Sequence, residues 1–291
     1  MKKIILLLLT TFSLSAQVKG VVLDSISGKP VAYVGVFTSK PEFNFSTDKK
    51  GKFKAENLTK QDTLWFFTTG YEEKKITVEN LDKKILLKPN ANTQETENID
   101  LYNQKKQWID FQTNNNSHSA SSYAATSLKA YFIEGISNQK NKLFLDNLSL
   151  STLNFSEKSN IFKIRFFKTD SLKNIGEEYN IDPLIINVKS SDSDGVNNII
   201  KNFIQTHDIN ILDRKIEIPE NGFFIAIEVI NIKKNRYTMD HNGTKVISIS
   251  PSIKTTKLET KVYQYNKGKW KATDKMNNYP DFKISIATTQ N

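Results

Sequence analysis

Short segments in which every second residue is apolar recur along the chain, and this pattern restricts the fold more than any other feature. In residues 18–89 such segments alternate with turns rich in Gly, Pro, Asn and Asp. The segment 31–38, VAYVGVFT, carries apolar or small residues on both faces, which indicates a central strand. Pro89 ends the pattern. Six or seven strands within about 70 residues predict a small β-sandwich or barrel.

The stretch STDKKGKFKAENL, residues 46–58, combines an acid, a glycine and several lysines, as ligand-binding loops often do. A phosphate loop needs a second glycine followed by Lys and Ser or Thr at the start of a helix, and this frame is missing. A calcium loop needs acids where two lysines stand. The remaining interpretation is a β-hairpin in which Asp48 accepts a hydrogen bond from the backbone two residues on, Gly51 has positive φ and Phe53 points inward.

A polar segment, residues 90–110, follows this first part and is predicted to be an interdomain linker. In residues 111–291 the strand patterns return, are longer and are rich in Ile, Phe, Tyr and Val. About nine strands predict a larger, jelly-roll-like β-sandwich. Residues 195–209 have apolar positions at helical spacing, and one short helix is predicted there. The predicted fold class is therefore all-β, with sandwich domains at 18–89 and 111–291.

The first 17 residues have the layout of a secretory signal peptide. Two lysines precede the apolar run 4–14 and small residues follow, so that the sequence allows cleavage after Ser15 or after Ala16. The run is shorter than the roughly 20 residues that span a membrane, and no second run reaches that length. We expect an exported protein without a transmembrane span, in the periplasm, at the outer cell surface or secreted.

The composition and motifs argue against several functional classes. The chain has no cysteine, which excludes disulfides, a lipidated cysteine and thiolate metal sites. Its formal charge of +10 is spread over scattered lysines, and without a recognition motif this predicts a solvated surface and no nucleic-acid partner. His118, His207 and His241 lack the spacing of a zinc site, and no G-x-S-x-G elbow occurs. Asp192 and Asp194 do not complete a calcium loop. We therefore predict no catalytic, cofactor or metal site.

Two groups of residues near or in the second domain are candidates for specific roles. Aromatic side chains that are candidates for stacking on sugar rings, with core packing as the alternative, are Trp108, Tyr263, Tyr265 and Trp270. Glu228 stands inside the apolar strand FFIAIEVI, where a carboxylate is either exposed at a sheet edge or paired. Arg165, in the strand FKIRFF, is the predicted partner in a buried structural ion pair.

Residues 20–71 carry an ordered pattern of glycines, acids and aromatics, namely G-x-V-x-D, G-x-P-V-x-x-V-x-V, T-D-x-x-G-x-F and D-T-L-x-F-x-x-x-G-Y. The residues of this pattern are Gly20, Asp24, Gly28, Pro30, Val31, Val34, Val36, Thr47, Asp48, Gly51, Phe53, Asp62, Gly70 and Tyr71. The pattern resembles the carboxypeptidase-D regulatory-like domain. The resemblance implies a seven-stranded transthyretin-like sandwich that directly follows the signal peptide of an exported Gram-negative envelope protein. It implies no peptidase activity.

The second half resembles an uncharacterised β-sandwich found with this module, through the segments IFKIRFFKTDS and KIEIPENGFFIAIEVI. Together the observations predict a non-catalytic envelope protein, a binding or structural module whose second domain recognises a glycan or an envelope protein. The alternative is a glycan- or peptide-acting hydrolase that uses carboxylates of the second domain. Two acids converging in a cleft would favour the hydrolase, whereas an exposed aromatic strip would favour sugar binding.

Overall fold

The computed structural model describes residues 16–90, 101–102, 108–110, 119–123, 126–136, 141–154, 158–189, 204–256, 260–266, 268–273 and 279–289. This part of the chain consists of strands, loops and short 3-10 turns and contains no α-helix. The all-β prediction is therefore confirmed. The predicted signal peptide up to residue 15, most of the predicted linker, and residues 190–203 with Asp192, Asp194 and most of the predicted helix lie outside the described residues.

Seven strands form the N-terminal domain. They are β1 (Ala16–Asp24), β2 (Gly35–Thr38), β3 (Phe45–Ser46), β4 (Lys52–Leu58), β5 (Thr63–Phe67), β6 (Lys74–Thr77) and β7 (Lys84–Leu87). They make two sheets, β4-β1-β7 and β3-β2-β5-β6, with 3-10 turns at Pro41–Phe43 and Val78–Asn80. Alternation of apolar and polar residues sends Val22, Phe53 and Phe66 into the space between the sheets, where they form the core. This is the predicted small seven-stranded sandwich.

The hairpin predicted for residues 46–58 has the expected geometry. Asp48 Oδ1 accepts hydrogen bonds from two backbone N–H groups of the turn, at 2.8 and 2.9 Å. Gly51 has a φ of 69°, and a Cβ at this position would lie 2.5 Å from a backbone carbonyl oxygen of β1, so that glycine is required. Phe53 is buried while the lysines on either side of it are exposed. The stretch is therefore a turn that fixes the register of β4.

Two sheets face each other in the second domain. One consists, among the described residues, of β8 (Leu101–Tyr102), β9 (Trp108–Asp110), β10 (Ser119–Tyr123), β12 (Leu143–Leu153), β16 (Ile204–Asn210), β18 (Arg236–His241), β19 (Thr244–Thr256), β22 (Tyr279–Pro280) and β23 (Lys283–Thr289). The other consists of β11 (Ser127–Ile133), β13 (Asn160–Thr169), β14 (Ile175–Glu178), β15 (Leu184–Val188), β17 (Phe223–Val229), β20 (Val262–Asn266) and β21 (Lys269–Ala272). We call them the nine-stranded and the seven-stranded sheet. Short 3-10 turns occur at Leu212–Arg214 and Lys233–Asn235. The main core lies between the sheets, as predicted for a larger sandwich.

Two local predictions differ from the structure. The helix predicted for 195–209 is wrong for its described end, because β16 is an extended strand paired antiparallel with β12. Pairing of all seven residues of β16 with a long neighbouring strand outweighs a local apolar spacing. β8 and β9, which fall in the predicted linker 90–110, both pair with β23. These parts of the segment therefore belong to the nine-stranded sheet.

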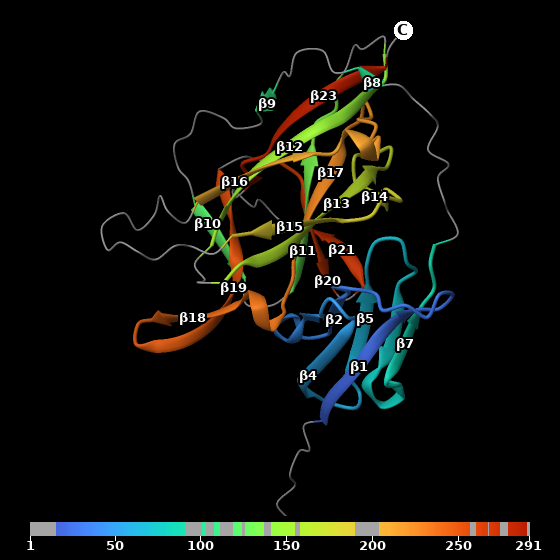
Figure 1. The fold of residues 1–291 in the computed structure, drawn as a ribbon, viewed down its shortest axis with the longest axis vertical. Helices are drawn as coiled ribbons and strands as arrows, with labels where there is room; N and C mark the ends of the chain where they lie inside the picture. Colours follow the sequence, from blue (N-terminus) through green and yellow to red (C-terminus); the bar gives the residue numbers. More distant parts are fainter. Residues whose placement is uncertain are drawn as a thin grey trace, which may run out of the picture.

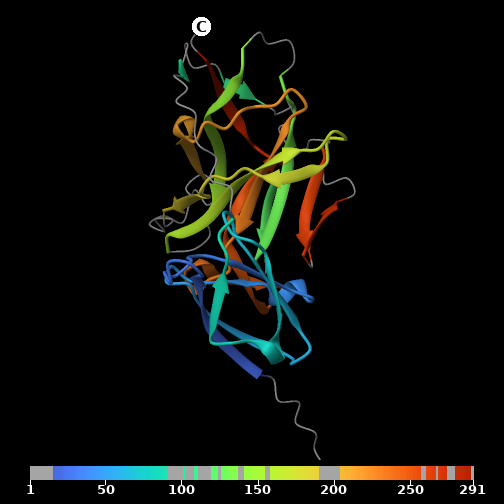
Figure 2. The same cartoon turned by 90° about the vertical axis from the view of Figure 1, so that its right-hand side faces the viewer.

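The two domains pack directly against each other, with the N-terminal domain at one end of the long axis (Figures 1 and 2). The sheet β3-β2-β5-β6 presents Phe37 and Phe67 to the outward face of the seven-stranded sheet, in one apolar cluster. There Tyr265 stacks on Phe67 with ring centroids 4.5 Å apart and meets Phe37 edge-on at 4.9 Å. The guanidinium of Arg165 lies 4.2 Å from the centre of the Phe67 ring. The interface therefore resembles a domain core.

A network of buried charges lies beside these rings. Arg165 Nη1 donates to Glu228 Oε2 at 3.2 Å, and its Nε and Nη2 donate to Glu178 at 2.8 and 2.6 Å. Lys163 Nζ lies 3.5 Å from Glu228 Oε1 and donates to a backbone carbonyl of the N-terminal domain. Thr69 of that domain donates to Glu178 Oε1 at 2.6 Å. The network thus joins both domains.

A polar cluster makes a further contact between the domains. Asn231 Nδ2 donates to Asn44 O at 2.9 Å, and the Asn231 backbone N–H donates to Thr126 Oγ1 at 3.1 Å. Ser46 Oγ and Thr126 Oγ1 are 2.9 Å apart. Such bonds are directional, so with the aromatic contacts they hold the two domains in one relative orientation.

Arg165→Met should lower the free energy of unfolding by about 3–5 kcal/mol, because it leaves Glu228 buried without its guanidinium partner. Urea denaturation followed by tryptophan fluorescence measures this loss. The matched control is Lys142→Met, which breaks the exposed pair between Lys142 and Glu217 and should cost less than about 1 kcal/mol. Equal losses for the two variants would show that the buried network does not stabilise the fold.

Candidate functional site

The outward face of the nine-stranded sheet carries rows of polar side chains. On β12, Asn147, Ser149 and Ser151 alternate with two leucines that enter the core. β16 pairs with one edge of β12 and β23 with the other. The register places Asp208 of β16 and Lys283 of β23 opposite Ser149, on its two sides. Groups far apart in the sequence therefore form one polar row across three strands.

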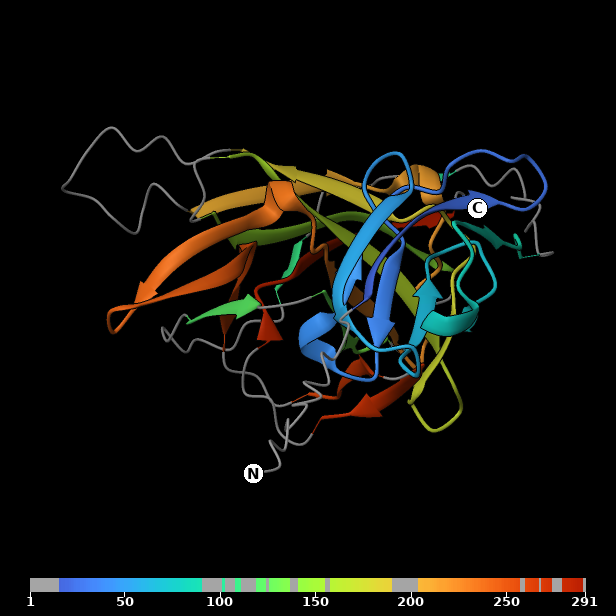
Figure 3. The same ribbon diagram turned by 90° about the horizontal axis from the view of Figure 1, so that it is seen from below.

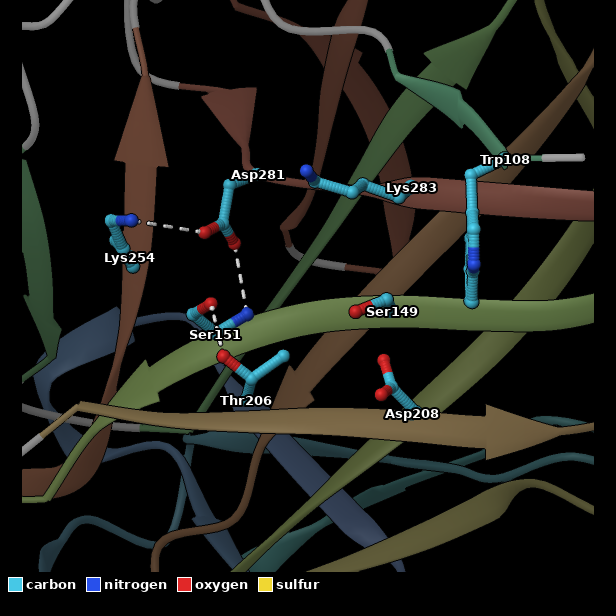
Figure 4. Close-up of a pocket in the computed structure, with 8 residues that line it drawn as sticks. All are labelled: Trp108, Ser149, Ser151, Thr206, Asp208, Lys254, Asp281 and Lys283. Carbon is cyan, nitrogen blue, oxygen red and sulfur yellow. Dashed lines mark hydrogen bonds and ion pairs between the residues drawn. The ribbon is translucent and has the colours of Figure 1, made fainter.

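This face contains a pocket of about 530 Å³ (Figure 4). Its lining residues are Trp108, Ser149, Ser151, Thr206, Asp208, Lys254, Asp281 and Lys283. Trp108 reaches the pocket from β9, which pairs with β23, and the residue remains 38% exposed. Figure 4 shows the indole beside Ser149, with Lys283 and Asp208 on either side of that serine. The pocket therefore joins one aromatic face to hydroxyl, carboxylate and ammonium groups.

Asp281 is held at one end of the pocket by fixed partners. Ser151 N–H donates to Asp281 Oδ1 at 2.8 Å, and Lys254 Nζ lies 3.5 Å from Oδ2. Ser151 Oγ is in turn 3.2 Å from Thr206 Oγ1. Burial raises the pKa of Asp281, which is only 5% exposed, although the bond from Ser151 and the charge of Lys254 act in the opposite direction. This carboxylate is oriented before any ligand arrives.

The two carboxylates of the pocket stand on opposite sides of β12. Asp208 belongs to β16, whereas Asp281 lies between β22 and β23, two residues before β23 begins. Two strand spacings, about 10 Å, separate the backbones on either side of β12. Asp281 directs its oxygens at Lys254 and at Ser151 (Figure 4). The two acids are therefore separate contact points and do not converge on one another.

The structure separates the four aromatic residues grouped as candidates. Trp108 lines the pocket, whereas Tyr263, Tyr265 and Trp270 lie on β20 and β21 at the domain interface. Tyr265 is 4% exposed, and its hydroxyl donates to Glu73 of the N-terminal domain. Because the N-terminal domain covers this face, these three rings pack in a core, which was the alternative interpretation. They do not form one strip with Trp108.

The structure brings Arg165 and Glu228 together in a fully buried ion pair. It adds two partners that sequence reasoning did not indicate, Lys163 and Glu178. Burial lowers the pKa of Lys163, and the charge of Glu228 opposes this shift. Since buried charges are tolerated only when they are paired, the geometry assigns the network a structural role at the interface.

The histidines contribute no metal centre in the described part of the chain. No group of three or more His, Asp or Glu side chains there is arranged to hold a metal ion. His207 Nε2 lies 2.8 Å from Thr152 Oγ1, and burial lowers the pKa of this imidazole. His118 lies outside the described residues. Within the described ranges, no helix is long and apolar enough to cross a membrane.

Sequence reasoning missed the polar members of the pocket. Ser149 and Ser151 stand in the alternating run NLSLST, and Asp208 is in phase with the polar positions of QTHDIN. That alternation was a usable signal for outward-facing strand positions. The pairing register that brings Lys283 and Asp281 beside them is not contained in any local segment. A list of polar strand residues could therefore have been predicted, but not the pocket.

Asp281→Asn should become more stable relative to the wild type as the pH rises from about 4, the pKa of an unfolded aspartate. A carboxyl whose folded pKa is raised binds its proton more tightly in the folded state, so stability is lost as the pH rises through that folded pKa. Urea unfolding at a series of pH values measures the difference. Asp208→Asn controls for the loss of one carboxylate from the same pocket. If the difference in the free energy of unfolding between Asp281→Asn and the wild type did not change with pH, the raised pKa of Asp281 would be contradicted.

Comparisons with known proteins identify the N-terminal domain. Searches for similar curated proteins found no match. Among solved structures, the chain is similar to the clostridial cysteine protease Cwp84 after propeptide cleavage, with 9% identity over 85% of this chain and 51% of that one and a TM-score of 0.36. It is also similar to the cysteine protease and lectin-like domains of Cwp84, a surface layer associated protein of Clostridium difficile, with 10% identity, coverage of 85% and 46%, and a TM-score of 0.32. The chain thus spans about half of the length of these structures. Residues 18–101 match the family model described as CarboxypepD_reg-like domain, and the N-terminal domain of this protein is therefore a CarboxypepD_reg-like domain.

Proposed function

We propose that this protein is an exported, non-catalytic binding protein of the cell envelope whose second domain recognises a carbohydrate in the pocket of Trp108. The observation that carries the proposal is an exposed indole placed beside hydroxyl and charged groups on paired strands. Export rests on the signal-like first 17 residues.

The chemistry of the pocket supports a sugar ligand. A pyranose ring has an apolar C–H face, which suits the flat indole of Trp108, and hydroxyls around its rim. Ser149 and Asp208 offer acceptors to those hydroxyls, and Lys283 offers a donor. A volume of about 530 Å³ accommodates a small oligosaccharide segment.

The fixed geometry of the pocket also supports binding. The polar groups stand on β12, β16 and β23, which are hydrogen-bonded along their length. Little side-chain freedom is lost when a ligand meets buried Ser149 and Ser151, so the cost of ordering is low. The regulatory-like N-terminal domain, a binding or structural module, fits the same interpretation.

A second candidate function, a glycan-acting hydrolase, is favoured by one observation. Asp208 and Asp281 line the same pocket, and burial raises the pKa of Asp281 as a general acid would require. Against it, Asp281 is occupied by Ser151 and Lys254, and the two acids lie on opposite sides of β12. We therefore give preference to binding.

Trp108→Ala should weaken binding of an oligosaccharide selected on a glycan array by at least about tenfold, because the stacking surface is lost. Isothermal titration calorimetry measures the affinity. Trp108→Phe keeps a smaller ring, so its affinity should lie between that of the wild type and that of the alanine variant. Lys245→Ala, on the exposed part of β19, is the control and should bind like the wild type. If Trp108→Ala bound the oligosaccharide with unchanged affinity, this pocket would not be the sugar-binding site.

The hydrolase is tested on the same ligand by chromatography of the reaction products. For a binding protein we expect the oligosaccharide to stay intact after prolonged incubation. Cleavage that is abolished in both Asp208→Asn and Asp281→Asn, with binding retained, would establish the hydrolase instead.

A further inference from the structure

The outward face of the sheet β4-β1-β7 carries four lysines around an aliphatic row. The register pairs Lys19 of β1 with Lys54 of β4, and it places Val21 between a lysine of β4 and a lysine of β7. Leu23 lies opposite Leu86 of β7. We call this set the basic face; its members are Lys19, Val21, Leu23, Lys52, Lys54, Lys84 and Leu86.

The basic face lies on the side of the N-terminal sandwich opposite the docked sheet, and at its β4 edge Lys52 and Lys54 line a pocket with Lys233 and Arg236 of the second domain. The other side of its sheet forms the N-terminal core, and the second sheet of the sandwich packs on the second domain. The N-terminal domain lies at one end of the long axis, and Figure 3 views the molecule from that end. The four lysines and Leu86 are exposed, and Val21 and Leu23 are partly exposed.

The lysines of the basic face are placed where they destabilise the sheet, and nothing in the fold requires lysine at these positions. Lys19 and Lys54 stand directly opposite each other on paired strands, and like charges in such positions are destabilising. Along β1, β4 and β7 the acid on this face is Glu56, which pairs with Lys54 at 2.7 Å. Lys74 adds a further ammonium at the edge, where it donates to Leu86 O at 2.9 Å. The face is therefore strongly positive, with an apolar middle.

Charge and composition together identify the kind of occupant. A positive face requires an anionic partner, and a second copy of this chain, with its formal charge of +10, would be repelled. Protein interfaces are enriched in aromatic residues and arginine and depleted in lysine. On the outward side of β1, β4 and β7 the basic face has lysines and aliphatic residues and neither arginine nor an aromatic ring, and Arg236 of the second domain adds a further positive charge beside β4. Lysines that extend past aliphatic side chains are typical of contact with anionic lipid headgroups.

We propose that the basic face docks the N-terminal domain on an anionic lipid surface. The ammonium groups contact lipid phosphates, each contributing about 1 kcal/mol near a charged bilayer. Leu86, with Val21 and Leu23, lies against the headgroup boundary. The second domain then extends away from the surface, because it is attached to the opposite sheet of the sandwich. This inference is independent of the sugar pocket.

Sedimentation with vesicles tests the inference on the chain from residue 17. We expect binding to vesicles of phosphatidylcholine and phosphatidylglycerol, little binding to phosphatidylcholine alone, and a steep loss with rising salt. The variant Lys19→Glu, Lys52→Glu, Lys84→Glu should lose at least about 100-fold in affinity. The control Lys245→Glu, Lys269→Glu, Lys271→Glu changes the net charge equally at exposed sites of the second domain and should keep most of the binding.

Leu86→Ser distinguishes a lipid surface from a soluble polyanion. It should weaken vesicle binding severalfold while its circular dichroism and melting temperature stay close to those of the wild type, since the side chain is exposed. Equal loss of vesicle binding in the two triple variants would show that net charge alone acts, and would overturn the proposal. So would binding to polyphosphate at least as tight as to vesicles together with no effect of Leu86→Ser, which would assign the face to an anionic polymer.

Discussion

The buried contact of Arg165 with Glu228 and Glu178 is the interaction on which the arrangement of the molecule depends. Burying a charge costs several kcal/mol unless it is paired and hydrogen-bonded. Here Arg165 is bidentate on Glu178 and also bonds Glu228, while Phe67 of the N-terminal domain covers the guanidinium. The ion pairs themselves lie within the second domain. The N-terminal domain completes the network with the hydroxyl of Thr69 and the carbonyl of Tyr33, so its docking keeps these charges out of water.

This coupling determines which surfaces remain for ligands. The N-terminal domain covers the outward face of the seven-stranded sheet, including the aromatic residues of β20 and β21. The outward face of the nine-stranded sheet keeps its polar rows and the pocket of Trp108. The outward face of β4-β1-β7 also stays exposed, at the other side of the N-terminal sandwich. A sugar pocket and a lipid-docking face would then be held at a fixed separation by one rigid body.

Local features of the sequence were sufficient for much of the fold. The hairpin around Asp48 and Gly51 follows from side-chain capping and from positive φ, which depend on a few adjacent residues. The pairing of Arg165 with Glu228 was predictable because an acid within an apolar strand needs a partner. The strand character of β16 was not, since its apolar spacing also fits a helix and only pairing with β12 resolves the ambiguity.

The sequence by itself determined an all-β chain, a regulatory-like first domain and the alternation that separates core from surface in each strand. The strand content and the alternation are set within about ten residues, by side-chain periodicity and turn chemistry. The regulatory-like pattern is read from the order of such short motifs over residues 20–71. The tertiary structure decided which surface faces are covered. It buried Tyr265 against Phe67 and left Trp108 exposed beside Ser149 and Asp208. Exposure depends on which sheet packs on which, and that is a property of contacts between distant segments.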